Sequence, residues 1–238
     1  MDIRFLGHSC FELADGDTRV LVDPFLSGNP KAAAEAGELE PTHILLTHGH
    51  PDHYGDIVDI AKRTSAQVVA IAEVANELGE QGLENVADPN IGGTVALRGD
   101  PSGDTPRGDG GWVRLTPAWH TGTTPNGTAH TPAGLVINLG GKTVYHVGDT
   151  SLFSDIRLAG ERDRLDAAIV CIGGHYTMDR QDAAIACEWI AAPVVIPCHY
   201  DTFPPIETDV QAFKSDVEER TGGKTTVEVL EPGGTLSL

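Results

Sequence analysis

Short apolar runs recur along the chain, and polar or glycine-containing turns separate them. Runs of about four to eight residues with such boundaries are typical of β-strands. We therefore expect strands within 3–25, 42–47, 67–72, 112–120, 133–150, 165–174, 193–200 and 225–230. The segments ADGDT and GGK interrupt the first and fifth of these ranges, so we expect a hairpin turn at each.

Four other segments carry apolar residues at a helical spacing, at 56–66, 72–82, 179–192 and 208–223. Pro193 predicts the end of the third helix, because the residue before a proline disfavours helical backbone. In the fourth helix, Thr208 and Gln211 fit a capping box, and Gly222 fits the stop.

The order of these elements predicts two β-sheets with helices on their outer faces. A strand-rich block is followed by strand–helix units, and this arrangement occurs twice. We expect residues 1–238 to form one domain, since no linker divides the chain. The segment 98–111, RGDPSGDTPRGDGG, is rich in Gly, Pro and Asp, and we expect it to be a surface loop or insertion.

Composition and charge narrow the class of protein and its partners. The 238 residues are 40% hydrophobic and 21% charged, as in globular proteins, with a formal net charge of −19. This charge disfavours nucleic acid and anionic membranes as partners, because phosphate groups would be repelled. A small-molecule substrate is the expected partner, and the sequence does not decide between a monomer and a homo-oligomer.

The first residues, MDIRFLGHSC, lack the features of a secretory signal, and no apolar run reaches the roughly 18 residues of a membrane span. We therefore expect a cytoplasmic protein. Its four cysteines form no CxxC pair and are expected to be buried, reduced thiols. Trp119 is expected in the core.

Histidines and aspartates follow the ends of several predicted strands. The segment THGHPDH contains three histidines and one aspartate, and it comes directly after the strand predicted at 42–47. Three more residues follow later strands: His120, Asp149 and His199. Strand ends on one edge of a sheet can lie close together in space. A lone His or Asp at such a position usually serves a turn, but the whole set favours a metal site.

The residue types indicate which metal chemistry the site supports. Imidazole and carboxylate groups bind zinc, manganese or iron, and the sequence does not choose among these metals. Seven side chains are candidate ligands, about the number that a two-metal site with a bridging water requires: His48, His50, Asp52, His53, His120, Asp149 and His199.

These motifs resemble those of the metallo-β-lactamase-fold hydrolases. THGHPDH is similar to the signature of that superfamily, and PAWHTGT, VYHVGDTS and VIPCHY are similar to its later metal motifs, in the same order. The segments LGHSCFEL, VDPF and GGHYTM resemble a subfamily of metal-dependent hydrolases related to ascorbate-6-phosphate lactonase. The resemblance implies an α/β (α+β) fold, an αββα sandwich in which helices flank two mixed β-sheets.

The resemblance also implies the metal ligands. One metal would be held by His48, His50 and His120, and a second by Asp52, His53 and His199, with Asp149 bridging both. The cofactor would be two divalent metal ions, with zinc favoured and manganese or iron as alternatives.

The expected activity is the hydrolysis of a small ester, lactone or phosphoester by water activated at the metals. Asp52 is predicted to orient that water, and His175 to protonate the leaving group. His8 is expected in the pocket or behind the ligands. Asp23 either hydrogen-bonds a metal-ligating imidazole or serves the turn before Pro24.

Two alternative functions remain open at this point. One is a nucleic-acid phosphodiesterase similar to ribonuclease Z, which the acidic charge disfavours, and the other is a di-iron redox or sensing protein.

Overall fold

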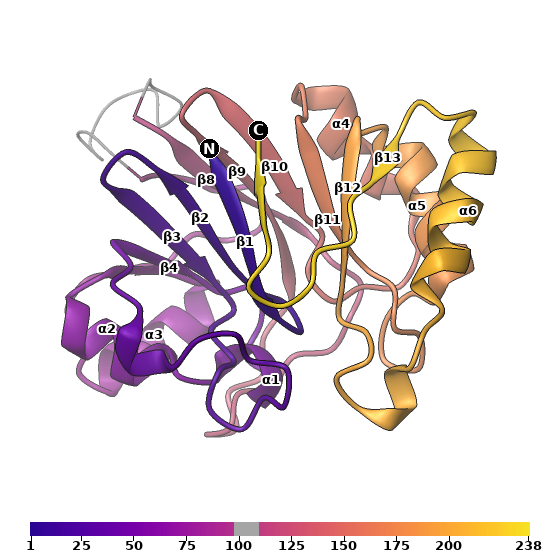
Figure 1. Ribbon diagram of the computed structural model, residues 1–238. Coiled ribbons are helices and arrows are strands. Elements are labelled where there is room, and N and C mark those ends of the chain that lie inside the picture. The colour runs from indigo at the N-terminus through magenta and orange to yellow at the C-terminus, as the bar shows by residue number, and fades with distance from the viewer. Residues whose placement is uncertain (98–109) are drawn as a thin grey trace.

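The computed structural model describes residues 1–97 and 110–238, and two β-sheets form its centre (Figure 1). The first sheet has seven strands in the order β14-β1-β2-β3-β4-β5-β6. Their bounds are β1 Asp2–Gly7, β2 Cys10–Asp15, β3 Thr18–Val22, β4 His43–Leu45, β5 Gln67–Val69, β6 Val86–Ala87 and β14 Thr235–Ser237.

The second sheet also has seven strands, in the order β13-β12-β11-β10-β9-β8-β7. Their bounds are β7 Thr94–Ala96, β8 Trp112–Pro117, β9 Ala133–Leu139, β10 Lys142–His146, β11 Ala167–Cys171, β12 Val194–Cys198 and β13 Thr226–Val227.

Both sheets are mixed and are built on the same plan. In the first, β1, β2 and β3 form an antiparallel meander, and β4, β5 and β6 continue parallel to β3. In the second, β8, β9 and β10 are antiparallel, and β11, β12 and β13 continue parallel to β10. Strands β1, β3 and β4 therefore end at the same edge of their sheet, and so do β8, β10, β11 and β12.

Helices cover the outer faces of the two sheets. On one side lie α2 Ile57–Thr64 and α3 Ala72–Glu80, and on the other α4 Leu158–Arg162, α5 Arg180–Ile190 and α6 Val210–Thr221 (Figure 1). The one-turn helix α1 Pro51–Tyr54 lies below the strands in this view. Short 3-10 helices occupy η1 Ala36–Glu38, η2 Ser154–Arg157 and η3 Pro204–Ile206. The predicted αββα sandwich of two mixed sheets is confirmed. In the part of the chain that is described, no helix is long and apolar enough to cross a membrane.

The apolar runs are buried as the strand predictions require. Every residue of β11 is buried, as expected for a parallel strand covered on both faces. In α2, the buried residues Ile57, Ile60 and Ala61 face the core, which explains the helical spacing of this segment. All four cysteines are buried and free of disulfides.

Several local predictions need correction. The last long helix is capped by Asp209, whose side chain accepts from the backbone N–H groups of Gln211 and Ala212, and the predicted Thr208–Gln211 capping box is absent. The hydroxyl of Thr208 instead donates to the carbonyl of Ile172, 3.3 Å away.

The sequence patterns also missed short elements. The one-turn helix α1 and the strands β6, β7 and β14, each of two to four residues, carry too few positions to show a period. The predicted closing strand at 225–230 is reduced to Thr226–Val227. Most of the predicted 98–111 loop lies outside the described residues, which resume at residue 110.

Candidate metal centre

Strand ends from both sheets meet at one edge of the sandwich, and the candidate ligands follow these ends. The segment after β4 supplies His48 and His50, and α1 contributes Asp52 and His53. From the second sheet come His120 after β8, Asp149 after β10 and His199 after β12. The predicted convergence of these side chains is observed.

Three histidines form the first group, since ring nitrogens of His48, His50 and His120 all lie within 4.8 Å of one another. Nε2 of His48 lies only 3.0 Å from Nδ1 of His50. The hydroxyl of Thr47 donates to Asp23, so it must accept from Nδ1–H of His48. Nε2 of His48 is therefore unprotonated, and its lone pair faces the centre. Burial keeps the pKa of His48 well below the usual range, so the ring is neutral.

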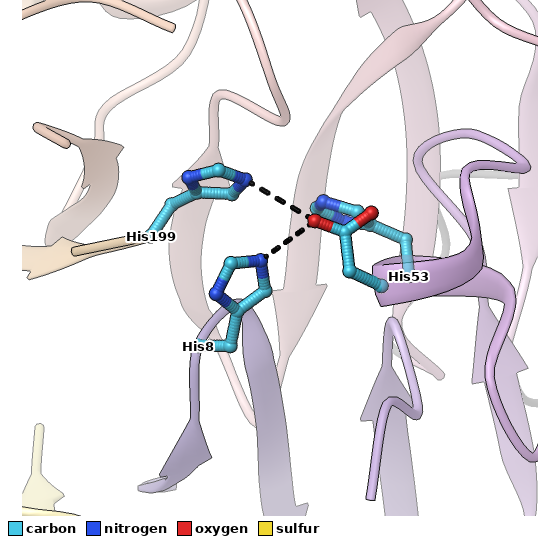
Figure 2. A group of neighbouring side chains, drawn as sticks. His8, His53 and His199 are labelled. Carbon is cyan, nitrogen blue, oxygen red and sulfur yellow. Dashed lines mark hydrogen bonds and ion pairs between the residues drawn. The ribbon is translucent and has the colours of Figure 1, made fainter. Parts of the chain in front are cut away.

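A second group consists of His8, Asp52, His53 and His199, whose nitrogen and oxygen atoms again lie within 4.8 Å of one another. Figure 2 shows His8 and His199 directed toward one carboxylate beside His53. This carboxylate is Asp52, whose Oδ2 is 3.1 Å from Nε2 of His8 and 3.7 Å from Nε2 of His199. The predicted ligands of the second metal were Asp52, His53 and His199, and the structure adds His8 to this group.

The Asp149 carboxylate lies between the two groups. Its Oδ2 approaches Nε2 of four histidines, at 3.0 Å from His199, 3.4 Å from His53, 3.7 Å from His120 and 3.8 Å from His48. Burial would raise the pKa of Asp149, but the neighbouring His199 and His53 rings hold it well below its usual range. Asp149 is thus an ionised carboxylate within reach of both groups.

Several buried polar atoms at this centre lack hydrogen-bond partners. Among the described residues, none makes a well-aligned hydrogen bond to Nε2 of His53, to either ring nitrogen of His199 or to Oδ1 of Asp149, although Nε2 of His53 and of His199 lie 3.4 and 3.0 Å from Oδ2 of Asp149. Leaving such atoms without a partner is costly in a protein interior. Imidazole nitrogens and carboxylate oxygens gathered in this way are a donor set that suits divalent transition metals. The residues present therefore fit a metal centre.

Asp23 orients one of the histidines from behind. Its Oδ2 accepts from Nδ1–H of His53 at 2.7 Å and from the hydroxyl of Thr47 at 2.6 Å, and its Oδ1 accepts from the backbone N–H of Thr47. Nε2 of His53 is thereby aimed at the centre. Carboxylates in this position fix the orientation of metal-ligating histidines.

His8 is also held from behind at Nδ1, which forms a hydrogen bond with the hydroxyl of Thr202 at 2.9 Å. Burial lowers the pKa of His8 to about 4, so its ring is neutral. His8, Asp23 and His199 all have positive φ angles, of 60°, 46° and 55°. Non-glycine residues adopt this conformation at a cost and are frequent at functional sites.

A cavity of about 470 Å³ opens onto the centre. Its lining residues are Phe25, His50, Pro51, Asp52, His120, Thr121, Asp149, Tyr176, His199 and Phe203. Five of the seven predicted ligands thus face the cavity, whereas His48 and His53 lie behind them, buried.

His175 occupies a different position from the one expected of a proton donor. Its side chain is exposed and packs edge-on against Tyr176, with ring centroids 4.5 Å apart. Tyr176 lines the cavity, and His175 is not among the described residues that do so. Trp119 is 68% exposed, so the prediction that it lies in the core is wrong.

Sequence reasoning missed the residues that support the ligands. Thr47, Thr202 and His130 each bond to a ligand segment or to His8, and Phe25 and Phe203 line the cavity. Thr47 precedes His48 at a strand end and could have been suspected. The others come from distant segments, and nothing local indicates their contacts.

Known proteins resemble this chain over its whole length. The family model described as Beta-lactamase superfamily domain matches residues 2–199. A metal-dependent hydrolase of Symbiobacterium thermophilum is 46% identical over 241 residues, which cover 100% of both chains. A metal-dependent hydrolase of Thermus thermophilus is 43% identical over 100% of this chain and 99% of its own.

A solved structure has the same fold. It is that of a metallo hydrolase from the hyperthermophilic archaeon Ignicoccus hospitalis, with a TM-score of 0.85 and 34% sequence identity. The match covers 99% of this chain and 97% of that one.

Proposed function

Because the chain belongs to the beta-lactamase superfamily and is a metal-dependent hydrolase, we propose that it uses two divalent metal ions to hydrolyse a small ester, lactone or phosphoester. The observation that carries this proposal is the position of Asp149. Its Oδ2 lies within 3.8 Å of His48 and His120 on one side and of His53 and His199 on the other. One carboxylate shared by two sets of imidazoles suits a pair of cations, because its negative charge would reduce their mutual repulsion.

Each metal would have its own ligands in addition to Asp149. His48, His50 and His120 would hold the first, and Asp52, His53 and His199 the second. Zinc suits this nitrogen-rich donor set best, and manganese or iron would also be accepted by it. His8 contacts Asp52 and would support the second set.

When bound, two such ions lower the pKa of a water molecule toward neutrality and stabilise the negative charge that develops during hydrolysis. Asp52 is half-buried at the cavity and is held by His8, so its carboxylate would orient the attacking water. Asp23 keeps the proton of His53 on Nδ1 and so leaves Nε2 available as a ligand.

The leaving group needs a proton donor at the cavity. The sequence prediction assigns this role to His175, but of these two neighbours it is Tyr176 that lines the cavity, so we assign the role to the hydroxyl of Tyr176. The acidic net charge of −19 continues to disfavour the nuclease alternative.

Metal content and activity test this function together. Protein purified without chelator should contain about two equivalents of metal per chain by plasma mass spectrometry. Chelation should abolish hydrolysis of an ester and lactone panel, and zinc, manganese or ferrous iron should restore it. His50→Ala and Asp149→Ala should lower the metal content and abolish hydrolysis. One equivalent in the wild type, or activity that survives Asp149→Ala, would contradict the two-metal site.

A further inference from the structure

Apart from the proposed metal ligands, the cavity at the centre is lined mainly by apolar and aromatic side chains. Of the lining residues that are not candidate ligands, three are Phe25, Phe203 and Pro51, and the other two are Tyr176 and Thr121. The part of a substrate that extends away from the metals would therefore contact hydrocarbon and aromatic surface.

Phe25 and Phe203 form one wall of this cavity. Their ring centroids are 6.4 Å apart, and both rings pack against His8, at 5.8 Å and 5.6 Å between centroids. They lie in loops that follow strands of different sheets, because Phe25 comes after β3 of the first sheet and Phe203 after β12 of the second. The wall thus stands beside Asp52, which His8 contacts through Nε2.

The backbone holds this wall in place. The loop that carries Phe25 is tied to the N-cap of α2, because the side chain of Asp56 accepts from the N–H groups of Leu26 and Ser27 at 3.0 and 2.8 Å. The carbonyl of Phe25 accepts from the side chain of Asn29 at 3.0 Å. Phe203 is followed by two prolines, which restrict the backbone of η3. A rigid, half-buried aromatic pair at a cavity is suited to binding an apolar group.

Among the described residues, the surface that lines this cavity carries no lysine or arginine side chain. The two arginines in the segment 98–109 lie outside the described residues. The described lining would offer no lysine or arginine to a substrate carboxylate or phosphate remote from the metals, and the net charge of −19 would repel such a group.

We propose that the substrate is an uncharged ester or lactone whose acyl or alkyl group is apolar and packs against Phe25 and Phe203. This inference rests on the proposed function and narrows it, because it removes phosphoesters and substrates with a second anionic group.

A pair of isosteric substrates tests the inference. 4-Nitrophenyl hexanoate and 4-nitrophenyl hydrogen adipate share a leaving group and differ in a terminal methyl or carboxylate, and the adipate chain is too long for its carboxylate to attack its own ester readily. The metal-loaded protein should prefer the hexanoate by roughly tenfold or more in kcat/KM. Bis(4-nitrophenyl) phosphate should be a poorer substrate than the hexanoate. Equal rates for the two esters, or a preference for the phosphodiester, would overturn the inference and leave the hydrolase standing.

Substitutions in the wall formed by Phe25 and Phe203 should change the preference for the ester with the apolar acyl group. Phe203→Ala should lower kcat/KM for the hexanoate by roughly tenfold and change the adipate rate much less. Phe203→Lys should raise the adipate-to-hexanoate ratio of kcat/KM above the wild-type value. Leu158→Ala is the matched control, because Leu158 is 49% exposed on α4, away from the cavity. Metal content must remain at the wild-type value in all three variants.

Binding to metal-free protein separates the inference from the proposed function. The amide 4-nitrobutyranilide should bind more tightly than N-(4-nitrophenyl)succinamic acid in saturation-transfer NMR, and Phe203→Ala should abolish the difference. Failure to hydrolyse any of the substrates would refute the proposed function. The comparison of the two amides would still show whether the wall of Phe25 and Phe203 prefers an apolar group to a carboxylate. Equal binding of the two amides would refute the apolar preference.

Discussion

The backbone N–H of Gly49 donates a hydrogen bond to Nε2 of His130, 2.9 Å away. Gly49 lies between the proposed ligands His48 and His50, so this bond fixes the backbone that presents both rings. Nδ1 of His130 donates to the carbonyl of Thr128, and the tautomer of His130 is thereby determined. A Cβ atom at Gly49 would lie 2.6 Å from Cγ2 of Thr124 and 2.9 Å from Cε1 of His130, so only glycine fits.

His130 is therefore expected to position the first metal site without touching the metal. We expect His130→Ala to weaken retention of one metal equivalent by roughly tenfold, as loss of supporting hydrogen bonds does in other metal sites. Competition with a chromophoric chelator measures this.

A second histidine variant controls for general effects. His43→Ala, at the opposite end of β4, should retain metal as the wild type does. His130→Gln, which keeps an acceptor for Gly49, should recover part of the loss. Equal retention by His130→Ala and the wild type would contradict the positioning role.

Asp23 should matter for folding as well as for the metal. Its carboxylate accepts three hydrogen bonds, from the backbone and hydroxyl of Thr47 and from His53, and it is fully buried. Asp23→Ala would leave these donors without an acceptor, so the metal-free protein should lose about 3 kcal/mol in its free energy of unfolding. Urea denaturation in the presence of chelator measures the loss.

Thr47→Val provides the smaller step for comparison. It removes one of the three donors to Asp23 and the acceptor of Nδ1–H of His48, and we expect a loss of about 1–2 kcal/mol in the free energy of unfolding. A loss as large as that of Asp23→Ala would show that Thr47, and not the carboxylate, dominates this network.

Glu77 holds the loop after His120, and its ionisation should make the stability of the protein depend on pH in the acid range. It is 8% exposed on α3 and accepts hydrogen bonds from Thr124, Asn126 and Tyr54. Burial would raise the pKa of Glu77, but these donors outweigh it and keep the pKa below the usual value. A lowered folded-state pKa stabilises the protein above the unfolded-state value, and that contribution is lost as the pH falls through the folded-state pKa.

Glu77→Gln should accordingly cost about 1–2 kcal/mol in the free energy of unfolding at pH 7. The difference from the wild type should shrink as the pH falls below about 4.5, the ordinary value for a glutamate. Urea unfolding at several pH values tests this, and a difference that stays constant down to pH 3 would rule out titration of Glu77 as the cause.

The convergence of the proposed metal ligands at one edge of the sandwich could be predicted from the sequence, because the ligand segments follow apolar runs. His48, Asp149 and His199 come within three residues of the ends of β4, β10 and β12, and these strands end at the same edges. Chain direction and burial alone therefore bring them together. The contact of His8 with Thr202 joins residues 194 positions apart, and no local pattern encodes it.

The cap of α6 shows a different limit of sequence reasoning. Thr208 and Asp209 are adjacent, and both can cap a helix. The tertiary contact of Thr208 with Ile172 leaves Asp209 to accept from the first turn. Trp119 lies two residues beyond the end of β8, so the burial of that strand does not extend to its side chain, which is 68% exposed.

The source of the leaving-group proton can be separated from metal activation by the choice of leaving group. A proton donor matters for an ester with a poor leaving group, such as an ethyl ester, and hardly at all for a 4-nitrophenyl ester. Because Tyr176 lines the cavity and His175 is not among the described residues that do so, we expect Tyr176→Phe to slow the ethyl ester by about 10²-fold and to leave the 4-nitrophenyl ester nearly unchanged. His175→Ala should affect both esters by less than about threefold, since its ring contacts Tyr176 and does not line the cavity. The reverse pattern, with the selective loss in His175→Ala, would return the role to His175 and require that the segment around it rearranges when substrate binds.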